Sequence, residues 1–336
     1  MAKKKRRNTE SMAPQRSDQV RVQSRRNERS AIENSKLTPG QVARRKARKR
    51  TSSTKPWLWV GGIVVAIAVI IGIFVLISNQ QSNAGVIGPT DPAVLQQVTG
   101  VKQSALADVG TGGVQNPMQP VAGNQPILNG PSGKPQLLYY GAEWCPYCAA
   151  DRWSVVVALS RFGTFKQLPE TTSSGSDVYP NTATFSFHQS QYSSNYIDFV
   201  PLEVQDRDGK TVLTPTPEQQ QLLNHYKITG FPFMNIAERY TATSLYSPDV
   251  LSGLSQKKIA DQLSDPTSKV SQNILGAANY LTAAICAATQ NQPANVCTVA
   301  PIPSVSQTLM TSPASPQSSI GNSSFAMIAP RREGLS

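Results

Sequence analysis

Two cysteines, Cys145 and Cys148, are the side chains of this chain best suited to chemistry. They lie in the run Trp144–Cys148, directly after the apolar stretch 137–140. A thiol attacks a disulfide only as its thiolate, and a second thiol within reach is needed to release the mixed disulfide that forms. Cysteines with this spacing can meet both demands, so the motif predicts a redox-active dithiol.

The start of a helix would supply what the first of these thiols needs. If a helix begins at Cys145, its sulfur lies beside backbone N–H groups without helical partners, at the positive end of the helix dipole. Pro146 then occupies the first turn, where a missing N–H costs nothing. We therefore expect Cys145 to be the exposed, attacking thiolate, with a pKa between about 3.5 and 7.5 instead of about 8.5. Cys148, one turn further on, is expected to be the less exposed, resolving thiol.

A zinc site is the main structural alternative for this cysteine pair. Paired cysteines with this spacing form half of many structural zinc sites, which need further ligands. The other cysteines, Cys286 and Cys297, lack the paired spacing, and His188 and His225 stand outside any ligand pattern. The sequence therefore favours redox chemistry over a metal site, and it indicates no cofactor.

Strands and helices alternate around the dithiol. The pattern predicts strands at 136–140, 197–204, 233–236 and 239–245, and helices at 145–162, 218–227, 248–263 and 270–289. Elements mixed at this spacing indicate an α/β architecture with one central sheet. The polar insertion 166–194 is longer than a simple connection requires. It is either a lid or partner surface, or an insertion without a role.

The segment Tyr139–Cys148, of sequence YYGAEWCPYC, resembles the active-site strand and helix start of thioredoxins, with the Pro-Tyr dipeptide of glutaredoxins between the cysteines. This resemblance implies a thioredoxin-like fold. It also implies that Trp144, Pro146 and Tyr147 border the sulfurs as part of a substrate-binding surface.

A second segment, Ile228–Phe233, resembles the thioredoxin loop whose proline is cis and lies against the dithiol. The resemblance implies that Phe231 and Pro232 hold a substrate peptide. An X-Pro bond reaches its cis form at a cost of about 0.5–1 kcal/mol, so the sequence permits such a loop. A simple turn into a strand is the alternative.

Residues 90–297 as a whole resemble the membrane-anchored thioredoxin-like proteins catalogued as domain of unknown function 929. The matching segments are Cys145–Ala150, Arg152–Trp153, Ala158–Gly163, Asp177–Thr182 and Ala283–Cys286. The resemblance implies a thioredoxin-like fold with an enlarged insertion and extra C-terminal helices, and it implies no activity. Ala149 stands where thioredoxins have a lysine, so proton handling at the site is expected to differ.

Cys286 lies near the end of the last predicted helix, and Cys297 follows that helix. In an oxidising compartment they are expected to form a structural disulfide that stabilises the fold by roughly 3 kcal/mol. A second redox relay that passes electrons to the dithiol is the alternative.

The charge of the chain is concentrated in its N-terminal tail. Residues 1–56 hold 18 of the 32 Lys and Arg residues and four of the 20 acidic residues, so this tail carries a formal charge of +14 and the remainder −2. The uncharged apolar run Trp57–Ile77 would span about 31 Å as a helix, which matches a bilayer core. Basic residues on its N-terminal side favour a cytoplasmic tail and an extracytoplasmic C-terminal region. A cleaved signal peptide and, for the tail, nucleic-acid binding are the less favoured interpretations.

These features predict a single-pass protein of the cell membrane. The expected segments are a disordered basic tail (1–56), a transmembrane helix (57–78), a linker with a helix at 91–109 (79–133), a thioredoxin-like domain (134–297) and a disordered Pro- and Ser-rich tail (298–336). We expect a thiol-disulfide oxidoreductase that acts on exported proteins and contacts membrane lipid and a redox partner. A non-catalytic adaptor, with an inert bridge at the dithiol and the insertion as its recognition surface, is the alternative. A cytoplasmic thiol reductase of reversed topology is a third.

Overall fold

The computed structural model describes residues 87–311 and 326–327, which belong to one compact unit, and the single residue Val69. The predicted basic tail 1–56 and nearly all of the predicted membrane helix 57–78 lie outside the described residues. Among the helices that are described, none combines the length and the apolar character needed to cross a membrane.

A mixed five-stranded sheet forms the centre of the unit. Its strands run in the order β1 (Gln119–Pro120), β10 (Tyr240–Ala242), β9 (Phe233–Ile236), β2 (Gln136–Gly141) and β7 (Asp198–Glu203). β2 and β7 are parallel, whereas the other neighbours are antiparallel. Every residue of β2 is buried, as expected for a central strand covered on both faces. The predicted α/β class is confirmed.

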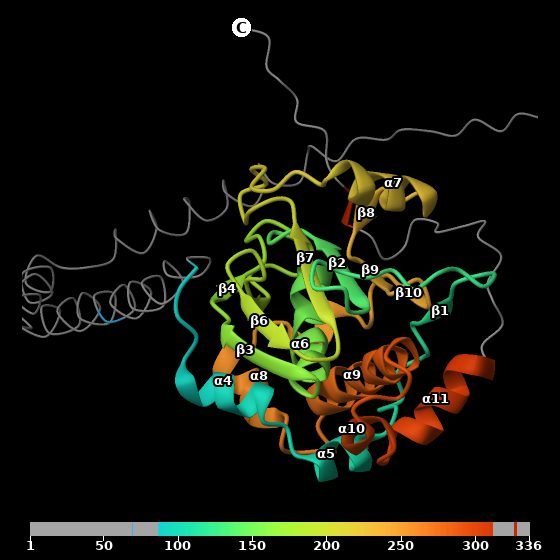
Figure 1. Cartoon of the computed structure of the whole chain (residues 1–336). Coiled ribbons are helices and arrows are strands. Elements are labelled where there is room, and N and C mark those ends of the chain that lie inside the picture. Colours follow the sequence, from blue (N-terminus) through green and yellow to red (C-terminus); the bar gives the residue numbers. More distant parts are fainter. Residues whose placement is uncertain (1–68, 70–86, 312–325, 328–336) are drawn as a thin grey trace, which may run out of the picture. The chain divides into compact units, whose positions relative to one another are not determined.

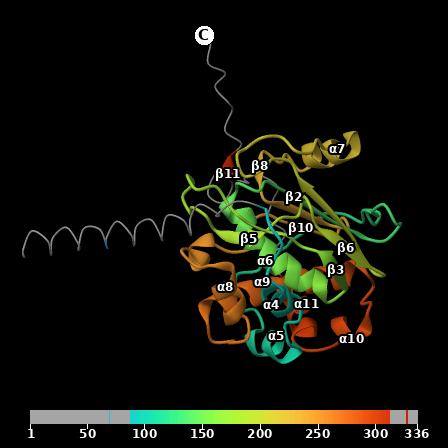
Figure 2. The same ribbon diagram turned by 90° about the vertical axis from the view of Figure 1, so that its left-hand side faces the viewer.

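Helix α6 (Pro146–Ser160) follows β2 and is buried along almost its whole length. It contacts the long helix α9 (Lys269–Ala288) on one side and strands of the insertion on another, and Figure 2 shows α6 and α9 close together. The Ser154 hydroxyl donates a hydrogen bond of 2.8 Å to the Ile274 carbonyl, which ties the two helices together. A helix that is apolar on nearly all sides can be stable only in such a buried place.

Helix α7 (Pro217–His225) connects β7 to β8 (Gly230–Phe231), and β9 follows directly. Figure 1 shows α7 beside β8, at the end of the molecule opposite α9. Thr216 begins α7 with a capping box, since its side chain accepts from the Gln219 N–H while the Gln219 side chain accepts from the Thr216 N–H. This reciprocal pair satisfies two donors that a helix start leaves free.

The segment before the sheet differs from the predicted linker. Residues 92–99 form α4 (Pro92–Thr99) and residues 103–109 form α5 (Gln103–Val109), so the single helix expected at 91–109 is broken at Gly100. Val94, Val98 and Leu106 are buried in the common core. The helical part of the segment 79–133 is therefore present as two helices, and both pack into the same unit.

The insertion is built of short hairpins. β3 (Gly163–Gln167) pairs with β6 (Gln191–Ser194), and β4 (Glu170–Thr172) pairs with β5 (Ala183–Phe185). Short strands with mixed burial give too weak an alternation to be recognised.

The C-terminal region also differs from the prediction. The expected helix at 248–263 is divided into the 3-10 turn η1 (Pro248–Leu251) and α8 (Gln256–Gln262). Residues 302–311 of the tail predicted to be disordered form α11 (Ile302–Thr311), which packs on α9. The buried residues Ile302, Val305 and Leu309 recur at helical spacing. Beyond it, β11 (Ala326–Met327) pairs antiparallel with β8.

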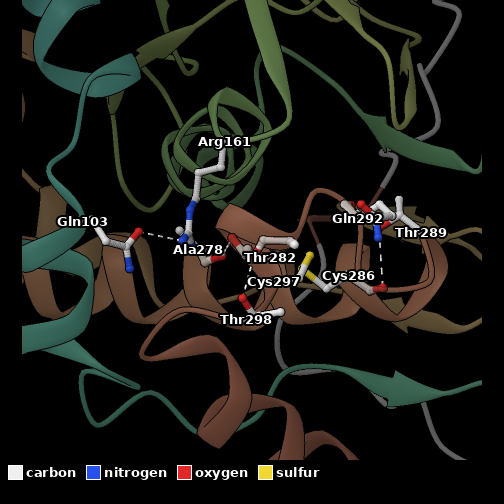
Figure 3. The surroundings of a disulfide bond; sticks show 10 residues. Gln103, Arg161, Ala278, Thr282, Cys286, Thr289, Gln292, Cys297 and Thr298 are labelled. Atoms are coloured by element: carbon white, nitrogen blue, oxygen red, sulfur yellow. Dashed lines mark hydrogen bonds between the residues drawn. A yellow bond between two sulfur atoms is a disulfide. The ribbon is translucent and has the colours of Figure 1, made fainter.

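A disulfide joins Cys286, near the end of α9, to Cys297 in the short helix α10 (Ala294–Cys297), as Figure 3 shows. The Cα atoms of the two cysteines are 5.6 Å apart. The predicted pairing of the two cysteines is confirmed. In the same region Arg161, which follows α6, donates a hydrogen bond of 2.8 Å to the Gln103 side chain of α5.

Candidate redox site

The dithiol lies where β2 gives way to α6. Cys145 is the residue that precedes the helix, and its backbone is extended; Pro146 is the first helical residue. The Cys145 sulfur accepts a hydrogen bond of 3.2 Å from the Cys148 N–H. The predicted helix start and the predicted place of Pro146 are confirmed, and they bring the first sulfur against a free N–H of the first turn.

The burial of the Cys145 thiol is contrary to expectation, whereas Cys148 was expected to be the less exposed of the two. Cys145 and Cys148 are free cysteines, and each is 0% exposed. Burial raises the pKa of Cys145 well above its usual value, and the neighbouring Cys148 raises it further. The expected exposed thiolate of lowered pKa is therefore wrong for this arrangement. Desolvation penalises the charged thiolate more than its N–H hydrogen bond favours it.

The pairing of β9 with β2 brings the loop that carries Pro232 to the end of β2, next to the dithiol. The Phe231–Pro232 peptide bond is cis, as predicted. Phe233, the next residue, pairs with Tyr140 of β2, so the loop lies at the end of the strand that leads to Cys145. The rings of Trp144 and Phe231 lie 5.9 Å apart in an edge-to-face arrangement.

The insertion borders the same site. The Ser174 N–H donates a hydrogen bond of 2.9 Å to the Trp144 carbonyl, and the rings of Tyr147 and Tyr179 meet edge to face at 6.1 Å. Arg207 holds this part of the insertion by donating to the Ser173 carbonyl and the Asn181 side chain. The insertion therefore contributes residues to the immediate surroundings of the dithiol.

The residues predicted to form the substrate-binding surface therefore gather around the dithiol. Trp144 and Tyr147 are partly buried and pack against the core that holds both sulfurs, Phe231 is fully buried, and Pro146 is buried at the helix start. The Trp144 indole N–H donates a hydrogen bond of 2.7 Å to the Gln205 side chain. This bond ties the turn before Cys145 to the segment that follows β7.

Three buried charged residues behind the dithiol were not among the predicted site residues. Asp151, Arg152 and Glu203 are each at most 1% exposed. One Asp151 oxygen accepts from the Leu245 N–H at 2.9 Å, and burial raises the pKa of its carboxyl group well above the usual value. The signal in the sequence was the dipeptide Asp151–Arg152, which interrupts an otherwise apolar helix.

The described residues also bear on the zinc alternative. Cys286 and Cys297 are bonded to each other and so offer no thiolate to a metal at the dithiol. In the described part of the chain, no three side chains of His, Cys, Asp or Glu gather closely enough to hold a metal ion.

Part of the chain is similar to a protein family. No curated protein and no solved structure matches the chain. Residues 123–228, which contain the dithiol, β2, α6, the insertion and β7, match the model of a family described as Domain of unknown function (DUF929).

Proposed function

We propose that this chain is a thiol-disulfide oxidoreductase in which Cys145 attacks and Cys148 resolves. The observation that carries the proposal is the position of the Cys145 sulfur, which accepts the Cys148 N–H at the start of α6. A hydrogen bond of this kind favours the thiolate over the thiol. The cis bond before Pro232 at the end of the same strand supports a site where an extended peptide passes the sulfur.

The strand order supports the finer proposal of a thioredoxin-like fold. In the sheet, four neighbouring strands lie in the order β7, β2, β9 and β10. Along the chain, α6 connects β2 to the insertion that leads to β7, and α7 follows β7 and precedes β9. This order resembles that of thioredoxins, as do the CPYC motif and the cis-proline loop. In this proposal Trp144, Tyr147 and Phe231 form the apolar border of the sulfurs.

Exported proteins are the proposed substrates. The apolar run 57–77 lies almost entirely outside the described residues, but its length and its basic N-terminal flank favour a membrane anchor with the dithiol on the extracytoplasmic side. The Cys286–Cys297 disulfide supports this placement, because disulfides persist mainly in oxidising compartments. An extracytoplasmic or membrane-bound redox partner would then recycle the dithiol.

A non-catalytic adaptor is the second candidate, and the burial of the dithiol favours it. Both sulfurs are fully buried, and the pKa of Cys145 is raised by that burial. In this alternative the cysteines only support the core, and the insertion segment next to Tyr147 is the recognition surface.

A trapping experiment distinguishes the two candidates. In Cys148→Ser, the mixed disulfide formed by Cys145 cannot be resolved, so disulfide-linked adducts with exported proteins should accumulate in cells that express the full chain. Cys145→Ser is the matched control, because it leaves the same number of free thiols and should give no adducts. Equal adduct levels in the two variants, or none in either, would rule out the oxidoreductase and leave the adaptor.

A further inference from the structure

A fully buried guanidinium lies on the helix that carries the dithiol. Arg152 is 0% exposed, and it follows Cys148 by four positions on α6. Residues four apart lie on the same face of a helix, so Arg152 is placed one turn below Cys148. A buried charge is tolerated only where partners compensate for its lost hydration.

The partners of Arg152 connect it to the turn that holds Cys145. Its Nε and Nη2 donate to the two carboxylate oxygens of Glu203 on β7, each at 2.9 Å. Nη2 also donates to the Ala142 carbonyl at 2.8 Å. The same carbonyl accepts from the Cys145 N–H at 3.3 Å. One backbone oxygen is thus shared by the guanidinium and by the residue that bears the attacking sulfur.

One nitrogen of this guanidinium is left without a partner. Arg152 Nη1 is buried and makes no hydrogen bond within the part of the chain that the structure describes. The guanidinium is therefore one hydrogen bond short of its full set, although Glu203 pairs with its charge. A buried cation stabilises an anion that forms close to it.

Several titratable groups interact electrostatically with Arg152, and they lie on the strands, the turn and the helix around it. They are Glu203 on β7, Glu143 in the turn after β2, Tyr139 on β2, and Asp151 and Cys148 on α6. Glu143 is engaged by the Ser186 hydroxyl. Burial raises the pKa of Glu203 to about 7, although the charge of Arg152 acts to lower it. The charge of Arg152 also lowers the pKa of Cys145, against the larger effect of burial.

We propose that Arg152 is a positioning residue that promotes ionisation of Cys145 for attack, since its buried positive charge stabilises the thiolate of the reduced pair and neither the thiol nor the disulfide. This inference rests on the proposed function. In the forward reaction the Cys145 thiolate attacks a substrate disulfide and releases one substrate thiolate. Cys148 then gives its proton to the released substrate thiolate and attacks the Cys145 sulfur, which breaks the mixed disulfide and releases the second substrate thiolate. The couple loses two electrons and the substrate gains them, and the charge of Arg152 bears only on the thiolate states.

The inference predicts shifts of opposite sign in two variants of the full chain. Glu203→Gln removes a negative charge and leaves the guanidinium, so it should lower the pKa of Cys145. Arg152→Met combined with Glu203→Gln removes the whole pair and should raise that pKa. Both changes are made in a Cys148→Ser background, and the reaction of Cys145 with iodoacetamide is followed at about pH 8, where Glu203 is ionised and the rate follows the thiolate fraction of Cys145. The rate should rise roughly threefold or more in the first variant and fall roughly threefold or more in the second.

A purely structural role for the pair would give a different result. Loosening of the site would move both variants in the same direction, and that outcome, or no change in either, would overturn the inference. Arg152→Lys keeps the charge while losing the two-pronged contact, so its alkylation rate in the same background should stay within about twofold of the rate of that background alone. If the double variant does not fold, the comparison of Glu203→Gln with Arg152→Lys decides. Because alkylation is measured without any substrate protein, an absence of trapped adducts would refute the proposed function alone.

Discussion

Removal of the Cys286–Cys297 disulfide should lower the free energy of unfolding by about 3 kcal/mol. The bridge has a sequence separation of 11, and a loop of this length loses about 3 kcal/mol of closure entropy in the unfolded chain at room temperature. Both cysteines are at most 5% exposed, so Cys286→Ala with Cys297→Ala is the suitable variant. Smaller, apolar side chains avoid burying a new polar group.

Urea unfolding followed by circular dichroism measures this loss. With a denaturant slope of roughly 3 kcal/mol/M for a unit of this size, the midpoint should fall by roughly 1 M. The unchanged chain unfolded in reductant serves as the control, and its midpoint should match that of the double variant in the same reductant. A loss below about 1 kcal/mol would refute the reasoning. It would mean that α10 detaches in a local opening that the rest of the unit survives.

Three further outcomes follow from particular contacts. Gly276→Ala should destabilise the unit by about 1–3 kcal/mol in urea unfolding, because a Cβ there would lie 2.2 Å from the Thr111 carbonyl oxygen. Gly88→Ala, which meets nothing within 4 Å, is the control and should change stability by less than about 0.5 kcal/mol. Truncation after Thr311 removes β11 from the edge of β8, and the thiols should then react faster with an alkylating reagent; an unchanged rate would show that β11 does not limit access. Burial raises the pKa of Glu203 to about 7, so the stability it contributes is complete below its unfolded pKa of about 4.3 and is lost as the pH rises through about 7. Glu203→Gln should flatten this part of the profile of stability against pH.

Local signals in the sequence were sufficient for the dithiol and its strand. β2 and α6 were predicted within a residue or two, because an apolar run is followed by a residue that begins a helix and by a proline in its first turn. The cis-proline loop and the disulfide were found in the same way. Each depends on a short motif or on the number of cysteines.

The remaining features depend on contacts between distant segments. Arg152 and Glu203 are 51 positions apart, and no periodicity reveals that β7 brings them together. Helix α11 was hidden by a Pro- and Ser-rich composition, although three apolar residues have helical spacing within it. The burial of Cys145 was missed because exposure was inferred from the helix start alone, whereas the aromatic loop at Phe231 and the insertion at Tyr179 also pack around the site.

The magnitudes at the dithiol indicate which step should control its chemistry. A hydrogen bond to a charged group contributes about 1.5–3 kcal/mol, which corresponds to roughly one or two pKa units. Full burial shifts a pKa by as much as about 3–5 units. The single N–H that Cys145 accepts therefore cannot offset its burial, and the raised pKa of its thiol reflects this difference. Two contributions can close the gap, namely the charge of Arg152 and a movement that lets water reach the sulfur. The charge of Arg152 is already present in the closed site, where the pKa of Cys145 is still raised. The oxidoreductase therefore needs the movement that lets water reach the sulfur, and this opening of the site should limit its rate.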